Sequence, residues 1–304
     1  MRPPLLLAIA ITLITWASAF VAIRHAVRGF PPGSLALIRF AIASAVLAVY
    51  VFGIRRRAPP RLNLRDLAGF ALIGVIGIVV YHVALNAGER TVSAGAASLL
   101  INTGPIWTAL IAIAFLGERL GTRGWIGTSV AFSGAALVSV GSAGGVRFDG
   151  DVALVVVASV AQAVYFVLQK PYLTRFGALD ATCYAIWIGT VVLLPFAPEA
   201  IHALGTASNA EISSAVYLGV VPGAIGNVTW IYTLAHMPAS RAASLLYLVP
   251  FIVFVIAWSM LGESPGWLSL AGGVPILIGV ALVNSERSVP PSRTVTTLMR
   301  GPNA

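Results

Sequence analysis

A long apolar stretch occurs twice in this chain, with its two copies about half a chain apart. The first copy covers residues 95–138 and the second covers residues 242–283. Pro105 of the first copy matches Pro250 of the second, and the Gly-Glu pairs and several glycines match at the same spacing of about 145 residues. A repeat of this length is too long for a solenoid unit, so we expect each copy to belong to one half of a duplicated membrane protein.

Composition supports the membrane class and excludes several others. Of the 304 residues, 58% are hydrophobic and 10% are charged, and the mean hydropathy is +0.92. A soluble domain carries about 25% charged residues. The net charge of +9 would suit a nucleic acid, but the arginines lie in short clusters between apolar runs, which excludes that partner. Cys183 is the only cysteine, so we expect no intramolecular disulfide, no metal site and no other cofactor.

A helix needs about 20 apolar residues to cross a bilayer. Ten segments meet this requirement and predict an all-α integral membrane protein: 5–26, 33–54, 66–86, 92–116, 122–141, 150–170, 180–198, 211–235, 239–261 and 266–284. The first segment imitates a secretory signal with a cleavage site at residues 17–19, but its apolar run continues, so we expect a retained span. Asp66 and Thr122 are predicted N-caps, and residues 287–304 are predicted to be a disordered cytoplasmic tail.

The placement of basic residues predicts the orientation. If the N-terminus is cytoplasmic, the loops and termini on that side hold 14 basic residues and the other side holds 4, with Arg39 left inside the membrane. We therefore expect both termini to lie in the cytoplasm. The expected location is the inner membrane of a bacterial cell. Five spans per half is an odd number, so the second half must enter from the opposite side. The prediction is two inverted five-helix repeats, at 1–141 and 147–286, around a site near the bilayer midplane.

Two helix breakers support this arrangement. Gly104-Pro105 and Pro250 fall at corresponding places within the fourth and ninth spans. Proline removes a backbone donor and bends a helix, and matched interruptions in two halves indicate a transport site. The alternative is that the prolines are merely tolerated, as in many membrane helices. The sequence leaves both interpretations open.

Several motifs follow one another in order along the chain. They are Trp16 with Phe20-Val21, Arg39-Phe40, Ala-Ala-Ser-Leu-Leu at 96–100 and 242–246, Pro105, Pro250, and Gly-Glu at 117–118 and 262–263. Their order resembles the EamA family of the drug/metabolite transporter superfamily over residues 5 to 285. The resemblance implies a ten-helix inner-membrane carrier, often an exporter of amino acids, other metabolites or drugs. In the second half Tyr184 and Trp187 stand in place of a partner for Arg39, which argues against a symmetric charge role.

Polar and aromatic side chains within spans are candidates for a cavity, because polar groups are costly in lipid and usually face the protein interior. Arg39 lies about two turns inside the second span, where it would bind a carboxylate or phosphate bidentately or, alternatively, snorkel to the interface or cap helix carbonyls. The alternatives for the others are interhelical hydrogen bonds for Asn and interface anchoring for Trp and Tyr. The predicted substrate-binding residues are Trp16, Arg39, His82, Asn102, Tyr165, Asn227, Trp230 and Tyr247.

Acidic residues are absent from the interior of the predicted spans. Glu118 and Glu263 lie at span ends, where we expect them to accept hydrogen bonds from backbone donors rather than to carry protons. Proton coupling would then have to use His82, whose imidazole titrates near neutral pH; otherwise the carrier is facilitative or an exchanger.

Two stripes of small residues allow helices to pack closely. One consists of Gly127, Ala131 and Ala135 in the fifth span, and the other of Gly219 and Gly223 in the eighth. The sequence leaves open whether they pack within the chain or between the copies of a homodimer.

These features predict a secondary transporter of small organic metabolites, amino acids among them, or of drugs. We expect it to export a small-molecule substrate across the lipid bilayer by alternating access around a cavity between the repeats. The alternatives are a non-transporting membrane scaffold and an intramembrane enzyme. We expect no enzyme, because the spans hold neither an HExxH motif nor a pair of carboxylates.

Overall fold

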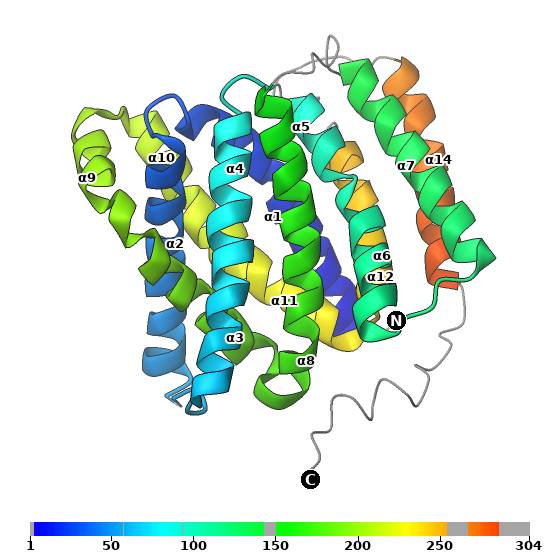
Figure 1. Cartoon of the computed structure of the whole chain (residues 1–304). Helices are drawn as coiled ribbons and strands as arrows, with labels where there is room; N and C mark the ends of the chain where they lie inside the picture. Colours follow the sequence, from blue (N-terminus) through cyan, green and yellow to red (C-terminus); the bar gives the residue numbers. More distant parts are fainter. Residues whose placement is uncertain (1–2, 57, 93, 143–149, 254–266, 286–304) are drawn as a thin grey trace.

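A computed structural model of the chain describes residues 3–56, 58–92, 94–142, 150–253 and 267–285. In these residues all regular structure is helical, as predicted (Figure 1). The α-helices are α1 (Pro3–Ala26), α2 (Pro32–Ala48), α3 (Leu64–Gly74), α4 (Tyr81–Gly88), α5 (Ala94–Ile101), α6 (Gly104–Leu116), α7 (Thr122–Ser142), α8 (Gly150–Leu193), α9 (Ala197–Thr206), α10 (Asn209–Leu218), α11 (Asn227–His236), α12 (Ala239–Ser244) and α14 (Trp267–Ser285). Short π-helical or 3-10 segments join some of them: η1 (Val49–Ile54), η2 (Val75–Val80), η3 (Leu194–Phe196), η4 (Gly219–Gly226) and η5 (Leu245–Tyr247).

Five of the described helical segments are long and apolar enough to cross a membrane. They are Pro3–Ala26, Pro32–Ile54, Leu64–Gly88, Gly150–Thr206 and Asn209–His236. Their side chains alternate between burial in the bundle and exposure of large apolar groups, which is what a lipid-facing bundle requires. The chain is therefore a multi-pass membrane protein.

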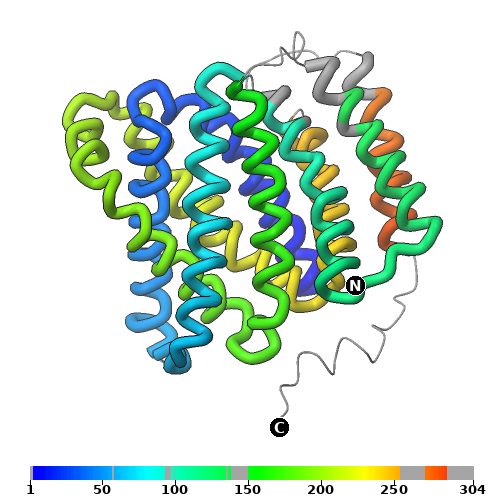
Figure 2. The backbone as a smooth tube through the Cα atoms, viewed as in Figure 1, coloured from blue at the N-terminus to red at the C-terminus, as the bar shows by residue number. Residues whose placement is uncertain are grey.

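The helices run between two ends of the bundle. Figure 1 shows α1 and α3 beginning at one end, called the lower end below, and α4 ending and α8 beginning at the other, called the upper end. Helix α8 turns back at the lower end, as the tube in Figure 2 shows, and its helical geometry is interrupted at Gly177. The φ of Gly177 is 75° and its ψ is 168°, a conformation that glycine adopts without the steric cost of a Cβ.

The predicted spans 150–170 and 180–198 both fall within α8 and the helices that follow it. The first helical stretch continues past residue 170 toward Gly177, and the second ends at Leu193 rather than at 198. A further helix, α9, follows at the upper end and was not predicted. It is only 10 residues long, which is too short to cross a bilayer, so it was not recognised as a span.

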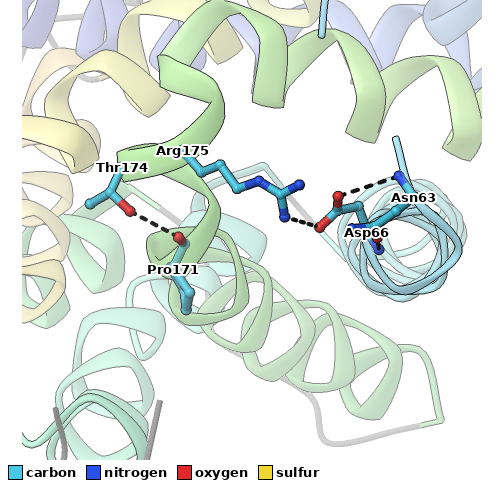
Figure 3. Close-up of polar contacts among 5 residues, drawn as sticks. All are labelled: Asn63, Asp66, Pro171, Thr174 and Arg175. Atoms are coloured by element: carbon cyan, nitrogen blue, oxygen red, sulfur yellow. Dashed lines mark hydrogen bonds and ion pairs between the residues drawn. The ribbon is translucent and has the colours of Figure 1, made fainter. Parts of the chain in front are cut away.

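Helices α3 and α10 both begin with a capping box. Asn63 is the N-cap of α3 and accepts a hydrogen bond from the amide of Asp66, while the Asp66 carboxylate accepts one from the amide of Asn63 (Figure 3). Ser208 and Glu211 form the same capping box at α10, 145 residues later. The predicted N-cap role of Asp66 is therefore wrong: Asn63 has the extended backbone of the N-cap, and Asp66 is the third residue of the helix, where its carboxylate completes the capping box.

The segments that follow these two helices match as well. After α3 the helix widens into the π-helical η2, and after α10 it widens into the π-helical η4, so both wide turns lie about 145 residues apart. Pro222 lies within η4, where its missing amide removes a helical hydrogen bond. Wide turns of this kind occur most often at functional sites.

Helices α7 and α14 pack against each other through glycines. A Cβ added at Gly127 would lie 2.7 Å from the carbonyl oxygen of Gly279, and one added at Gly134 would lie 2.6 Å from that of Gly272. The second stripe packs on α2, where a Cβ at Gly219 would lie 2.8 Å from the carbonyl oxygen of Arg39. Both predicted small-residue stripes therefore contain glycines that contact helices of the same chain.

Some predicted features lie outside the described residues. Glu263 and the end of the ninth predicted span fall in residues 254–266, and the predicted tail at 287–304 falls in residues 286–304.

Candidate functional site

A cavity lies in the middle of the helix bundle. Its lining residues come from α1, α2, η2, α4, α5, α8, α11 and the segment around Pro250: Trp16, Ala19, Phe20, Ile23, Arg39, Gly77, Tyr81, His82, Leu85, Ile101, Asn102, Gln162, Tyr165, Phe166, Asn227, Leu246 and Val249. The cavity volume is about 50 Å³. Since one water occupies about 10–15 Å³ by this measure, the cavity admits a few waters but is too small for an amino acid in this conformation.

The break between α5 and α6 supplies one wall. Helix α5 ends at Ile101 and α6 begins at Gly104, so Pro105 stands in the first turn of a new helix. The Asn102 amide nitrogen donates to the carbonyl oxygen of Ser98 at 2.7 Å, which leaves its buried side-chain oxygen without a partner among the described residues. A broken helix thus presents an amide oxygen at the cavity. At the matching position, the 3-10 segment η5 precedes Pro250.

Two of the π-helical segments, η2 and η4, position a tyrosine and an asparagine. Gly77 in η2 faces the ring of Tyr165, because an added Cβ would lie within 1.8 Å of its Cδ2 atom. The side chain of Asn227 donates to the carbonyl oxygen of Gly223 in η4 at 2.9 Å, which satisfies an acceptor freed by the wide turn. Tyr165 donates to Asn227 Oδ1 at 3.5 Å. The wide turns therefore make room for Tyr165 and fix Asn227.

Aromatic side chains form another wall. The Trp16 ring lies 6.0 Å from the Phe166 ring and 5.2 Å from the Trp230 ring, measured between centroids. Trp230 is buried behind these two rings and does not line the cavity, and Tyr247 is buried with its ring 6.5 Å from that of Phe132. The structure therefore brings six of the eight predicted substrate-binding residues to the cavity and places the other two outside its lining.

Arg39 and His82 are the basic residues of the lining. The Arg39 side chain is 4% exposed, and its Nε and Nη1 atoms have no hydrogen-bond partner among the described residues. The His82 ring lies 4.5 Å from that of Phe40 and 4.4 Å from that of Tyr81. Arg39 therefore neither snorkels to the bundle surface nor caps a helix carbonyl with these atoms. Arg39 is among the residues that line the cavity.

Glu89 is a buried acid that the sequence analysis missed. It follows directly after α4, is 0% exposed, and neither carboxylate oxygen has a hydrogen-bond partner among the described residues. Burial raises the pKa of Glu89 well above its ordinary value, and the charges of Arg24 and Arg39 oppose this shift. The missed signal is helical spacing, because Glu89 continues the face of His82 and Leu85 beyond the predicted end of the span at residue 86.

Glu118 holds the start of another helix. Its carboxylate accepts hydrogen bonds from the Ala239 amide at 2.7 Å, the Ser240 amide at 3.1 Å and the Ser240 hydroxyl at 2.7 Å. These donors belong to the first turn of α12, whose amides have no helical acceptor. The predicted structural role of Glu118 is confirmed, although its donors lie far away in the sequence rather than next to it.

Known proteins resemble this chain along nearly its whole length. The EamA-like transporter family matches residues 3–140 and again residues 151–285. The chain belongs to this family. The cavity lies between the two matched segments, since Trp16 through Asn102 come from the first and Gln162 through Val249 from the second.

Relatives of this EamA-like chain carry transporter names. A probable terminal-alkyne amino-acid exporter of Streptantibioticus cattleyicolor is 43% identical over 91% of this chain and 92% of its own. A probable amino-acid metabolite efflux pump of Escherichia coli is 26% identical over 89% of this chain and 91% of its own. A solved crystal structure aligns with a TM-score of 0.74 over 94% of this chain and 98% of its own, and its 18% identity shows a shared fold.

Proposed function

We propose that this EamA-like protein is a secondary transporter that exports small amino-acid metabolites. The observation that carries the proposal is the cavity itself, which is lined from both family segments at points where the helices are interrupted. Interrupted helices near the middle of the membrane expose backbone and side-chain polar groups to a substrate rather than to lipid.

Two inverted five-helix repeats, at residues 1–141 and 147–286, build the transporter. The matched capping boxes and the matched π-helical segments support a duplication. The glycine contacts support the inversion. Gly127 contacts Gly279, and Gly134 contacts Gly272. Because Gly127 corresponds to Gly272 in the repeat and Gly134 to Gly279, exchanging the two repeats turns the first contact into the second. A two-fold axis in the membrane plane produces this reciprocal pattern.

The surplus of basic residues on one side supports an orientation with both termini in the cytoplasm, and a bundle of ten crossing helices would suit a bacterial inner membrane. The substrate is a small molecule with a carboxylate and an apolar body. Arg39 supplies the cation for the carboxylate, and Trp16, Phe166 and Tyr165 supply apolar and aromatic surface. This chemistry suits the amino-acid substrates in the names of the two relatives.

The size of the cavity supports alternating access. At about 50 Å³ the cavity is smaller than an amino acid, so the bound state would be a more open one in which the two repeats have moved apart at one end. Rocking of one repeat against the other would expose the cavity at each end in turn.

The test is flux through purified protein in proteoliposomes. L-Propargylglycine, an amino acid with a terminal alkyne, would be used beside common amino acids and cationic drugs, with and without a pH gradient. We expect saturable flux of amino acids. Absence of flux for every compound in folded protein would contradict transport and leave the membrane scaffold as the function.

A matched pair of variants on α1 locates the pathway. Ala19 lines the cavity and is 6% exposed, whereas Ala10 is exposed on the outer surface of the same helix. Ala19→Leu adds three carbons to the cavity and should reduce flux at least tenfold, whereas Ala10→Leu should leave it unchanged. Equal flux in the two variants would place the pathway elsewhere.

A further inference from the structure

Two buried charges of opposite sign lie toward the upper end of the cavity. Arg39 is 4% exposed and Glu89 is 0% exposed, and the two charges interact electrostatically without forming a direct ion pair. The Arg39 Nε and Nη1 atoms and both Glu89 oxygens lack hydrogen-bond partners among the described residues. Buried charged groups left in this state are costly, so they mark a site whose partner arrives from outside.

Helix α4 aims Glu89 along the cavity wall. The Glu89 amide donates to the carbonyl oxygen of Leu85 at 2.9 Å, so the helical turn continues through Glu89. His82 and Leu85 line the cavity. Residues three, four and seven positions apart share a helix face, which places Glu89 one turn beyond the cavity lining toward the upper end.

We propose that Arg39 and Glu89 form a subsite for the two charged groups of a zwitterionic amino acid. The guanidinium of Arg39 binds the α-carboxylate and the carboxylate of Glu89 binds the α-ammonium. Each buried charge then gains a partner of opposite sign, and the loaded site is neutral overall. The inference rests on the proposed function and specifies which part of the substrate is recognised.

Other titratable groups surround Glu89. They are Arg24 from α1, Arg39 from α2, Tyr81 and His82 from α4, and Asp151 from α8. Arg24 Nη1 donates to the carbonyl oxygens of Glu89 at 3.4 Å and Val92 at 2.9 Å, and Asp151 accepts from Thr91 at 2.5 Å. These interactions hold the loop that carries Glu89, and none of them uses the Glu89 carboxyl.

Protons and substrate compete for Glu89. Burial raises the pKa of this carboxyl, which favours its protonated form while the site is empty. When the ammonium group binds, the Glu89 O–H bond breaks and the proton leaves to water. Because one proton and one zwitterion alternate at the same carboxylate, an inward proton gradient would drive export of the amino acid.

Calorimetry on the full-length protein in lipid nanodiscs measures this competition directly. L-Propargylglycine would be titrated in two buffers with different enthalpies of ionisation, which gives the number of protons released. We expect about one proton per bound amino acid at pH values below the Glu89 pKa, falling to zero as the pH rises through it. Binding without proton release at every pH would overturn the proposal.

Derivatives of the same amino acid test the two charges separately. N-acetylation removes the ammonium and methyl esterification removes the carboxylate. We expect each derivative to bind the wild-type protein about 10- to 100-fold more weakly. Equal affinity for the amino acid and its N-acetyl derivative would overturn the role of Glu89, and this comparison needs no variant.

Variants then assign each preference to a residue. Glu89→Gln should remove the preference over the N-acetyl derivative together with the released proton, whereas Arg39→Gln should remove the preference over the ester. Glu199→Gln is a matched control, because Glu199 is exposed on α9 and accepts from Ser34 outside the cavity. The His82→Gln variant should still release a proton when the amino acid binds. If proton release were lost in His82→Gln and kept in Glu89→Gln, the released proton would come from His82 instead.

The two levels of failure are distinguishable. Absence of both binding and flux for all amino acids contradicts the proposed function. Binding and flux that persist without a preference for the ammonium group contradict the zwitterion subsite alone.

Discussion

Glu118 shows how one side chain can join two distant parts of a membrane protein. Its carboxylate accepts three hydrogen bonds from the first turn of α12, more than 120 residues along the chain. We expect Glu118→Ala to lower the free energy of unfolding by about 2 kcal/mol, because it leaves partly buried amides without an acceptor. Thermal stability in detergent measures the effect. Glu118→Gln, which keeps one acceptor oxygen, should recover part of it.

The same variant separates structure from proton transport. A cap has no part in the titration that accompanies transport, so the pH profile of flux in folded Glu118→Gln should match the wild type. A flattened pH profile with unchanged stability would instead identify Glu118 as a proton carrier.

At the residue scale, the sequence predicted most of the residues that line the cavity but missed the buried acidic residue next to it, Glu89. Trp16, Arg39 and Asn102 were recognised because polar and mid-span aromatic residues fit lipid poorly. Glu89 was missed because hydropathy ended the span at residue 86, and hydropathy does not report whether a helix continues into a buried turn. Tyr247 has the same sequence signal as Tyr165, yet only packing against Phe132 reveals that it lies outside the cavity lining.

At the element scale, glycines let α7 and α14 pack with their backbones in close contact. A Cβ at Gly127 would meet the carbonyl oxygen of Gly279 at 2.7 Å. We expect Gly127→Ala to lower the free energy of unfolding by about 1–3 kcal/mol, since overpacking forces the helices apart. Gly205→Ala in α9 is the control: no atom lies within 4 Å of the added Cβ, and alanine favours the helix. Equal thermal stability of the two variants would contradict the tight interface.

The sequence predicted where apolar helices lie but not how they are interrupted. Ten apolar runs follow from composition alone, because a bilayer demands length and hydropathy. The widening of η2 and η4 depends on which carbonyl oxygen each backbone amide donates to. Packing against neighbouring helices affects this pairing, as where the Tyr165 ring packs against Gly77. For the same reason the turn at Gly177 within α8 was placed only approximately.

At the scale of the whole molecule, two ion pairs join the first family segment to the second at the lower end. Arg175 contacts Asp66 at 2.7 Å, as Figure 3 shows, and Arg55 contacts Asp180. Both arginines are partly exposed while both aspartates are nearly buried. These pairs hold the two family segments together at the lower end.

Removing both arginines should open the lower end. We expect Arg55→Gln with Arg175→Gln to raise the population open at that end roughly two- to fivefold, a small effect because solvent screens exposed charges. Labelling rates of a cysteine placed at Ala19 would report the opening from that side. High salt should produce the same change in the wild-type protein, and insensitivity to both treatments would contradict a role for these pairs.

The most direct test of transport by two moving halves is a pair of distances measured by electron spin resonance between spin labels. One pair of labels, at Arg65 and Thr174, reports on the lower end, and a second pair, at Arg28 and Asn209, reports on the upper end; all four residues are exposed. Alternating access predicts that saturating L-propargylglycine changes the two distances in opposite directions. Two distances that stay fixed, while the same protein carries the amino acid across a membrane, would contradict rocking of the two repeats around the central cavity.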